Sequence, residues 1–268
     1  MELKIFSKDN RETGKKKMPA QFSEPFRLEI IKRAVEAIQN NTRQPYGTYP
    51  DAGQRHSVFV SKKRRRFKGV YGKSLTRTPK KVMSHNGSQF NWVGAQVPNA
   101  RGGRAAHPPK AEKIWDRKIN DKERRMAIRS ALSAALNAVL VKKRGHKAPA
   151  SYPFLISKDF EAISKTKDFV KALLSLGFDA EIERASVKKI RAGCGKSRGR
   201  PYHKAKGPLI VVSSDCALLK SAKNIPGFDV VDVKNVNAEL LAPGCVPGRI
   251  SLFTEGAIDL MVKEGLFE

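Results

Sequence analysis

Apolar residues recur at helical spacing in two long stretches of this 268-residue chain. The first stretch, residues 25–41, opens with Pro25, which is well tolerated in a first helical turn. Its apolar stripe consists of Phe26, Leu28, Ile30, Ile31, Ala34, Val35 and Ile38. The second stretch runs from Asn120 to about residue 143, with a stripe of Met126, Ile128, Leu132, Leu136, Val139 and Leu140. Stripes of this period predict one amphipathic helix in each stretch.

The second predicted helix also carries start and stop signals. Asn120-Asp121-Lys122-Glu123 has the form of a capping box, with Asn120 in the cap position. Gly145 follows the apolar stripe and suits a helix end.

Short strands and helices are predicted to alternate through most of the remaining chain. Polar and apolar residues alternate over residues 2–6, which predicts a first strand. Further strands are expected over residues 152–156, 178–182, 209–213, 228–233 and 250–253. Helices are expected over residues 166–176, 216–222 and 236–241, and from a Thr254 cap to about residue 263. This alternation predicts an α/β fold with a mostly parallel sheet covered by helices.

Residues 43–110 follow neither period and contain many glycines and prolines. A structureless stretch of this length is rare inside a compact domain, so it is either disordered or held open by a partner. Its aromatic residues are too many for a simple flexible linker: Tyr46, Tyr49, Phe59, Phe67, Tyr71, Phe90 and Trp92. We therefore predict a single domain over residues 1–268, with one long extended loop over 43–110 inserted after the first helix.

Positive charge is large and concentrated in two segments. The chain has 53 Lys and Arg against 25 Asp and Glu, a net charge of +28. Residues 43–110 hold 15 of these cations and one acid, Asp51, while residues 184–206 hold nine cations and no acid. Such segments predict a polyanionic partner, and basic residues interleaved with aromatic rings suit RNA phosphates and bases.

Several other classes of protein are disfavoured. The N-terminus has no apolar run of signal-peptide length, and residues 131–141 are too short to span a bilayer. We therefore expect a soluble, cytoplasmic protein without a membrane partner. The three cysteines, Cys194, Cys216 and Cys245, are widely spaced, which argues against a disulfide framework or a zinc site.

One motif resembles a phosphate-binding loop. In Gly193-Cys194-Gly195-Lys196-Ser197, the glycine that a Walker loop needs five residues before Gly195 is replaced by Ile190. A glycine-rich basic loop that approaches RNA phosphates fits better. The segment after Phe6 also lacks the glycine-rich turn of a methyltransferase, and the five histidines are scattered. We expect no catalytic residues, metal, cofactor or small-molecule substrate.

Four stretches of the chain resemble the large-subunit ribosomal protein four family (universal uL-four), in its archaeal and eukaryotic branch. The first is Arg43-Gln44-Pro45-Tyr46-Gly47 with Ala52-Gly53-Gln54-Arg55-His56-Ser57. The second is Gly102-Gly103-Arg104-Ala105-Ala106-His107-Pro108-Pro109-Lys110, running on into residues 118–131. The third covers residues 191–202, and the fourth covers residues 237–244, 247–249 and 253–255.

The resemblance implies an α/β body bound to large-subunit rRNA and a long loop that helps to line the nascent-peptide exit tunnel. It implies rRNA, neighbouring large-subunit proteins and the nascent polypeptide as partners, on the cytoplasmic ribosome. The chain stops at Glu268 without a long Lys-rich tail, which favours the archaeal type. An RNA-modifying enzyme and a free RNA-binding regulator remain as alternatives.

Two sets of site residues follow from charge and resemblance together. The expected rRNA-binding residues are Arg43, Arg55, His56, Lys62, Lys63, Arg64, Arg65, Arg66, Lys68, Lys73, Arg77, Lys80, Lys81, Arg101, Arg104, His107, Lys110, Arg191, Lys196, Arg198, Arg200 and Tyr202. The loop tip is expected within residues 82–96, because no basic residue occurs between Lys81 and Arg101. The expected tunnel-lining residues there are His85, Gln89, Phe90, Asn91 and Trp92. For Phe90 and Trp92, packing against a neighbouring protein or a stacked base is the alternative.

Overall fold

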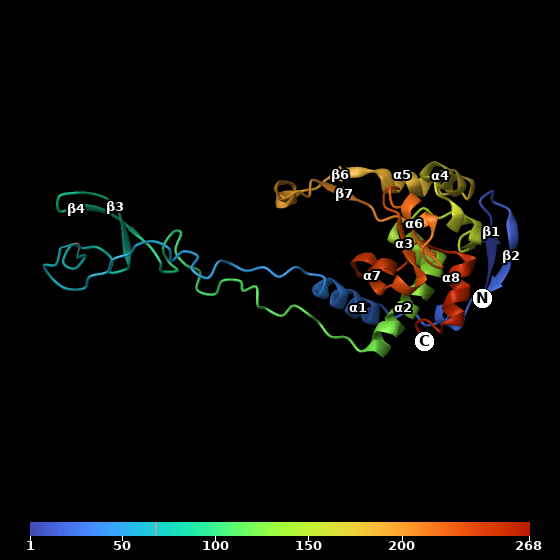
Figure 1. Cartoon of the computed structure of the whole chain (residues 1–268), viewed down its shortest axis with the longest axis horizontal. Coiled ribbons are helices and arrows are strands. Elements are labelled where there is room, and N and C mark those ends of the chain that lie inside the picture. Colours follow the sequence, from blue (N-terminus) through green and yellow to red (C-terminus); the bar gives the residue numbers. More distant parts are fainter. Residues whose placement is uncertain (68) are drawn as a thin grey trace. The chain divides into compact units, whose positions relative to one another are not determined.

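The computed structural model describes residues 1–67 and 69–268. The chain divides into two compact units (Figure 1). We call Met1–Thr42 together with Asp116–Glu268 the body, and Arg43–Trp115 the insert. Each unit is described by itself.

The strands of the body form several small sheets, and the sheet around β8 (Leu209–Val212) is wholly parallel. β8 lies between β10 (Ser251–Phe253) and β9 (Asp229–Asp232), parallel to both. β1 (Glu2–Phe6) lies between β2 (Glu12–Lys17), to which it is antiparallel, and β5 (Leu155–Ile156), to which it is parallel. A parallel bridge from Ile156 to Thr254 joins the two sheets. β6 (Lys188–Ile190) and β7 (Tyr202–Lys204) form a separate antiparallel pair.

Helices account for much of the remaining body. The α-helices are α1 (Leu28–Asn41), α2 (Asp121–Leu136), α3 (Ala138–Arg144), α4 (Thr166–Ser175), α5 (Asp179–Ser186), α6 (Ala217–Ser221), α7 (Ala238–Leu241) and α8 (Glu255–Lys263). Short 3-10 helices are η1 (Ala20–Phe22), η2 (Lys158–Ala162), η3 (Gly193–Arg198), η4 (Val233–Asn235) and η5 (Pro243–Cys245). The mixed α/β class is confirmed. The strands, however, are divided among several small sheets, and of the described sheets only β10-β8-β9 is wholly parallel.

The apolar run of β8 explains how the body is layered. Side chains alternate across a strand, so Leu209 and Val211 point to one face while Ile210 and Val212 point to the other. All four are fully buried, and each pair belongs to a different core cluster. The sheet is therefore covered on both faces, which is why this strand reads as a continuous apolar run.

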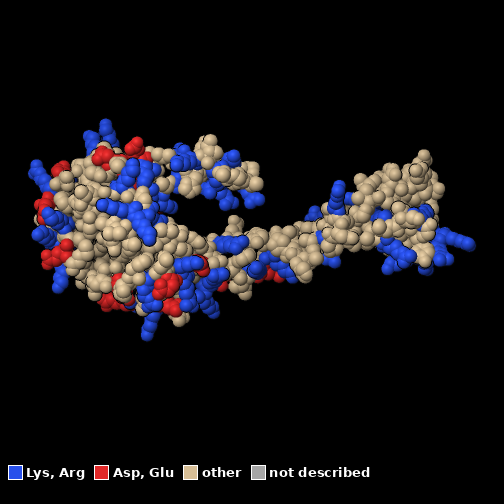
Figure 2. Space-filling model, turned by 180° about the vertical axis from the view of Figure 1, so that it is seen from behind, with Lys and Arg blue, Asp and Glu red and all other residues tan. Residues whose placement is uncertain are grey.

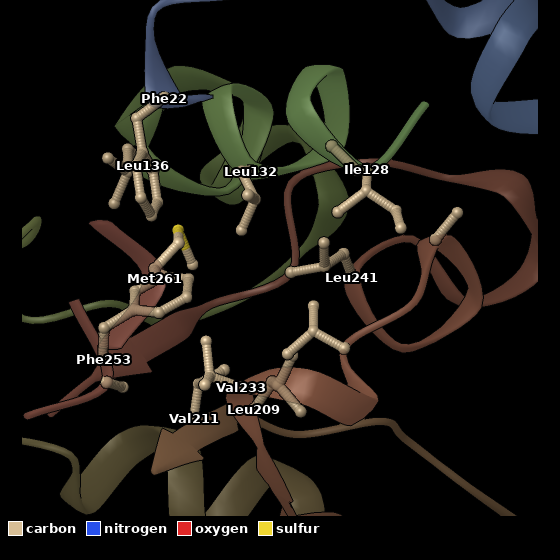
Figure 3. Packing of buried hydrophobic residues seen from close by; sticks show 14 of the residues in the cluster. Phe22, Ile128, Leu132, Leu136, Leu209, Val211, Val233, Leu241, Phe253 and Met261 are labelled. Carbon is tan, nitrogen blue, oxygen red and sulfur yellow. The ribbon is translucent and has the colours of Figure 1, made fainter. Parts of the chain in front are cut away.

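The first core cluster lies between α2 and the sheet. Ile128, Leu132 and Leu136 of α2 point toward Leu209, Val211 and Phe253 of the strands, with Met261 of α8 between them (Figure 3). Burying an aliphatic or aromatic side chain of this size stabilises the fold by roughly 1.5–3 kcal/mol. The apolar stripe predicted for residues 120–143 is the face that makes this contact.

That predicted helix is two helices, because Asn137 interrupts it. Asn137 has extended backbone angles, and its side-chain oxygen accepts from Val139 N at 3.0 Å and Leu140 N at 3.4 Å, so it begins α3. Asn120 occupies the predicted cap of α2 but makes no capping hydrogen bond there. Gly145 ends α3 with φ +95°, as predicted.

Other predicted boundaries were also wrong. α1 begins at Leu28 rather than Pro25, because Arg27 is extended and its backbone N–H donates to Ser130 Oγ at 2.7 Å. Residues 178–182 are not a strand: α5 begins at Asp179, with buried Glu181 and Ala185 at helical spacing. Only Leu155–Ile156 of the strand expected over 152–156 pairs with a neighbour. The strand β2 was not predicted, because apolar and polar residues do not alternate along it.

The insert contains one regular element that the sequence pattern did not predict. β3 (Lys80–Asn86) and β4 (Gln89–Gly94) form an antiparallel hairpin with a bulge between Val82 and Ser84. The hairpin covers most of residues 82–96, where the tip of the loop was expected.

Candidate nucleic-acid interface

Two legs of the insert, residues 43–56 and 96–115, lie side by side. Thr48 N donates to Pro109 O at 3.0 Å, and Gln96 Nε2 donates to Gln54 O at 3.1 Å. Glycines permit the close approach: a Cβ at Gly53 would lie 2.5 Å from Arg104 N. Within the second leg, a Cβ at Gly103 would lie 2.1 Å from Val97 O, so the turn between them also depends on glycine. Real Cβ atoms cannot approach backbone atoms so closely, so these positions require glycine.

Arginines of the insert stack on aromatic rings. The guanidinium of Arg55 lies 3.7 Å from the Tyr49 ring centre, and that of Arg77 lies 4.7 Å from the Tyr71 ring centre. Among its described residues the insert has no ion pair, because its acids are only Asp51 and Glu112. Stacking holds a planar guanidinium by its face and leaves its N–H edge free for phosphate.

Most of the expected rRNA-binding residues of the insert are exposed (Figure 2). On the face shown, the charged side chains of the insert are mostly blue, whereas blue and red mix over the body. The exposed residues are Arg43, Arg55, His56, Lys62, Lys63, Arg64, Arg65, Arg66, Lys73, Arg77, Arg101, Arg104, His107 and Lys110. Lys81 is half-buried, and Lys68 lies outside the described residues. These side chains form a cationic surface with two carboxylates in the insert, Asp51 and Glu112, neither of which forms an ion pair among the described residues.

Lys80 differs from the other expected contacts because it points into the insert. The residue is only 7% exposed. Its ammonium group donates to Thr76 Oγ1 at 2.9 Å, to Thr76 O and to Thr78 O at 3.4 Å. Its charge is thus solvated by oxygens of the insert itself. Lys80 serves to fix the turn before β3 rather than to present a cation.

The five residues expected to line the tunnel all lie on the β3–β4 hairpin but divide between its faces. Phe90 and Trp92 share one face, where their rings are 5.7 Å apart and His85 lies 5.7 Å from Phe90. Phe67 packs edge-on against Phe90 at 5.5 Å, which covers that face in part.

The opposite face of the hairpin carries Gln89 and Asn91. Both are exposed, and Asn91 Nδ2 donates to Ser84 Oγ across the strands at 2.8 Å. The hairpin therefore has one aromatic face and one face on which the amides of Gln89 and Asn91 lie toward the turn and Lys81, paired with Val93, lies toward the other end.

The second basic segment forms a hairpin of its own. β6 and β7 pair from Lys188 with Lys204 to Ile190 with Tyr202, and η3 closes their end. Lys196, Arg198, Arg200 and Tyr202 are exposed. We call residues 188–204 the basic hairpin. A phosphate-binding loop joins a strand to a helix, so this strand–strand connection agrees with the rejection of a Walker motif.

Arg191 holds the end of the basic hairpin together. The half-buried side chain donates from Nε to Arg200 O at 3.2 Å and from Nη2 to Tyr202 O at 3.3 Å. Its methylene chain also fills the space beside Gly195, where a Cβ would lie 2.7 Å from Arg191 Cδ. Arg191 thus shapes the loop that presents the neighbouring cations.

The sequence did not predict the environment of one half-buried cation of the body, Arg144. Burial lowers the pKa of its guanidinium to about 10, with help from the nearby charges of Arg249 and Arg184. Nη2 donates to Pro243 O at 2.8 Å, but Nη1 has no partner within the described part of the chain. The only signal in the sequence was the run Lys142-Lys143-Arg144, which ends α3 like many ordinary helices.

The family of this chain follows from comparison with known proteins. A model described as the ribosomal protein L4/L1 family matches residues 17–264, which includes the whole insert and nearly all of the body. The chain belongs to the ribosomal protein L4/L1 family. The resemblance noted in the sequence is thereby confirmed.

Archaeal members of the L4/L1 family are similar over almost the full chain. Large ribosomal subunit protein uL4 of Nanoarchaeum equitans is 44% identical over 268 residues, covering 100% of both chains. The uL4 protein of Archaeoglobus fulgidus is 40% identical and covers 97% of this chain and 98% of its own. That of Methanococcoides burtonii is 43% identical, with 95% and 94% covered. The archaeal type is therefore confirmed.

In the part of the chain that the structure describes, none of the helices has the length and apolar character needed to cross a bilayer.

Proposed function

We propose that this chain is a structural constituent of the large ribosomal subunit that binds large-subunit rRNA through the insert and the basic hairpin. The main support for this proposal is the set of exposed cations in the insert, which have no ion-pair partners among its described residues. Its archaeal relatives, named as large-subunit proteins, match both units of the chain. A folded chain of net charge +28 needs a polyanion to offset its self-repulsion.

The function so defined requires no chemical reaction. Lysines and arginines neutralise phosphates and release counterions, which allows RNA segments to approach one another. Phosphate contacts also fix the register of the protein on the RNA. The folded body anchors both ends of the insert and both ends of the basic hairpin. Neighbouring large-subunit proteins would meet the same RNA.

The hairpin of the insert is proposed to help line the nascent-peptide exit tunnel. This follows the family resemblance and fits the uncharged turn end of the hairpin, where Gln89 and Asn91 lie. A nascent chain with charges of either sign can pass this end without strong attraction. His85, Phe90 and Trp92 lie on the aromatic face, with Phe67, and are better placed against RNA or a neighbouring protein.

The rRNA-binding proposal can be tested by the salt dependence of binding. We would measure retention of large-subunit rRNA by the full chain over a range of salt, and compare a variant in which Lys62, Lys63, Arg64, Arg65 and Arg66 are all changed to Gln. The slope of log affinity against log salt should fall by roughly 4, since each lost phosphate contact removes about 0.7–0.9.

A matched control removes the same charge from the body. The exposed lysines Lys165, Lys167, Lys171, Lys220 and Lys263, all changed to Gln, should leave the slope nearly unchanged. Equal losses in the two variants would show nonspecific charge attraction and would contradict the assignment of the insert.

A further inference from the structure

A cavity of about 690 Å³ lies within the insert, between the start of one leg and the end of the other. It is lined by Tyr46, His107, Pro108, Pro109, Lys110, Glu112, Lys113 and Trp115. This volume is within the range of small-molecule sites, roughly 300–1,000 Å³, and is ample for one nucleotide.

One wall of the cavity is aromatic. The rings of Tyr46 and Trp115 are nearly parallel, with an interplanar angle of 20° and centres 5.8 Å apart. The guanidinium of Arg43 lies 3.8 Å from the centre of the Trp115 ring. This cation covers a face of the indole and holds it in place, and the Tyr46 ring, which is 49% exposed, is the surface on which a planar base can stack.

The indole of Trp115 also has an unused hydrogen-bond donor. Its Nε1 is buried and has no partner among the residues that the structure describes. An indole N–H can only donate, and buried Trp normally finds an acceptor for it. The donor thus points to a ligand that brings an acceptor, as ring nitrogens and carbonyls of nucleobases do.

Cations surround the same cavity. Lys113 Nζ lies 4.3 Å from the Trp115 ring centre, and Lys110 is exposed at the rim. Neither forms an ion pair within the described residues, although Glu112 is also part of the lining. The two ammonium groups leave a place for one phosphodiester beside the aromatic wall.

We propose that this cavity holds a single unstacked nucleotide of an RNA strand. Its base stacks on the exposed ring of Tyr46, beside the edge of the indole, so that an acceptor at the edge of the base meets the in-plane N–H of Trp115, and its phosphate lies near Lys110 and Lys113. The proposal rests on the proposed rRNA binding and adds to it one specific nucleotide-binding site within the insert. Splayed-out bases stacked on aromatic side chains are the usual mode in which proteins recognise single-stranded RNA.

The test uses the two tryptophans of the chain as separate reporters. In the full chain with Trp92→Phe, emission comes from Trp115, and with Trp115→Phe it comes from Trp92. Each protein is titrated with a single-stranded oligoadenylate of about ten nucleotides, and binding is followed independently by the anisotropy of the labelled RNA. We expect the RNA to quench Trp115, while Trp92 reports separately on RNA near the hairpin of the insert.

Substitutions separate a stacked base from a general electrostatic effect. Tyr46→Ala, in the Trp92→Phe background, should weaken RNA binding about tenfold, which is the usual effect of losing one stacked base. Tyr46→Phe should restore it. Tyr49→Ala is the matched control, because Tyr49 stacks on Arg55 and does not line the cavity.

The outcomes distinguish this site from rRNA binding in general. RNA that binds by anisotropy without changing Trp115 emission would overturn the site and leave the proposed function standing. Emission that responds to an acidic peptide but not to the oligoadenylate would make the cavity a protein-docking site and also overturn it. Failure to retain either the oligoadenylate or large-subunit rRNA would overturn both proposals.

Discussion

His146 Nδ1 lies 2.7 Å from Glu181 Oε1 inside the body, where both side chains are almost completely shielded from solvent. Arg184 donates to both oxygens of Glu181 at 2.6 and 2.8 Å, and Lys147 N donates to Oε2 at 2.9 Å. Burial alone would raise the pKa of Glu181, but these hydrogen bonds outweigh it and lower the pKa to about 2. Burial also lowers the pKa of His146, despite the nearby carboxylate.

Acid should destabilise the body through this pair. Both groups have a lower pKa in the folded chain than in the unfolded chain, so their contribution is complete above about pH 6.5 and is lost as pH falls. The contribution of His146 to the free energy of unfolding begins to fall below pH 6.5. Glu181 contributes roughly 3 kcal/mol, which is lost between about pH 4.5 and 2.

The pH dependence can be checked by urea unfolding followed by far-ultraviolet circular dichroism, which reports mainly the helical body. Glu181→Gln should be less stable at neutral pH and should lose less stability between pH 4.5 and 2. A wild-type chain whose unfolding free energy is constant from pH 6.5 to 3 would contradict the account.

Two arginines of the body, one buried and one half-buried, should respond differently to replacement by Met. Arg249 is 1% exposed and donates to Gly207 O at 2.8 Å, Leu240 O at 2.8 Å and Asp229 Oδ2 at 2.5 Å. Arg249→Met removes the donor from Gly207 O and Leu240 O and leaves Asp229 Oδ2 with Lys206 Nζ alone, which should cost about 3–5 kcal/mol.

Arg144 has no carboxylate partner within the described residues, so Arg144→Met should leave the stability of the free protein unchanged or raise it by about 1 kcal/mol. The same denaturant titration compares the two variants. If both lose several kcal/mol, Arg144 has a stabilising partner that this interpretation lacks.

Gly103→Ala should loosen the legs of the insert. The new Cβ would lie 2.1 Å from Val97 O, so the backbone must move and the Gln96 contacts with the other leg should break. Limited proteolysis of the free protein should then cut the insert faster. Gly14→Ala in β2 is the control, because nothing lies within 4 Å of its Cβ position. Unchanged cleavage in Gly103→Ala would show that this approach is not required.

Alternation along β4 gives a test of the proposed tunnel face. A photoreactive side chain placed at Gln89 or Asn91 should crosslink to a stalled nascent chain, whereas one at Phe90 should crosslink to RNA or protein neighbours. Crosslinks to the nascent chain only from the Lys62–Arg66 run would contradict the placement of the tip. Equal yields from all three hairpin positions would contradict the assignment of faces.

Strong local signals in the sequence predicted much of the body. The apolar run at Leu209–Val212 is a strand buried on both faces, and Thr254 caps α8 by accepting from Ala257 N at 3.2 Å. Phe178 misled the prediction, because an apolar residue followed four positions later by Ile182 fits a helix as well as a strand. Acidic residues in the first turn of α5, Asp179 and Glu181, favoured the helix.

Placement of the candidate site residues was harder to predict than their identity. Charge density identified the insert and the basic hairpin, but it could not show that Lys80 turns inward, which depends on Thr76 and Thr78. Nor could it show the cavity, because Tyr46 and Trp115 are far apart in the sequence and meet only where the two legs lie side by side. Contacts of this kind depend on tertiary structure, and no local period reports them.

Sedimentation tests the central claim most directly. A native cell lysate is washed at moderate and at high salt and separated on a sucrose gradient, and this chain is detected across the fractions. If the chain is a structural constituent bound to large-subunit rRNA, it should remain with the large subunit after the moderate-salt wash. Early release, with the chain running as a free protein or in a small RNA complex, would contradict that claim.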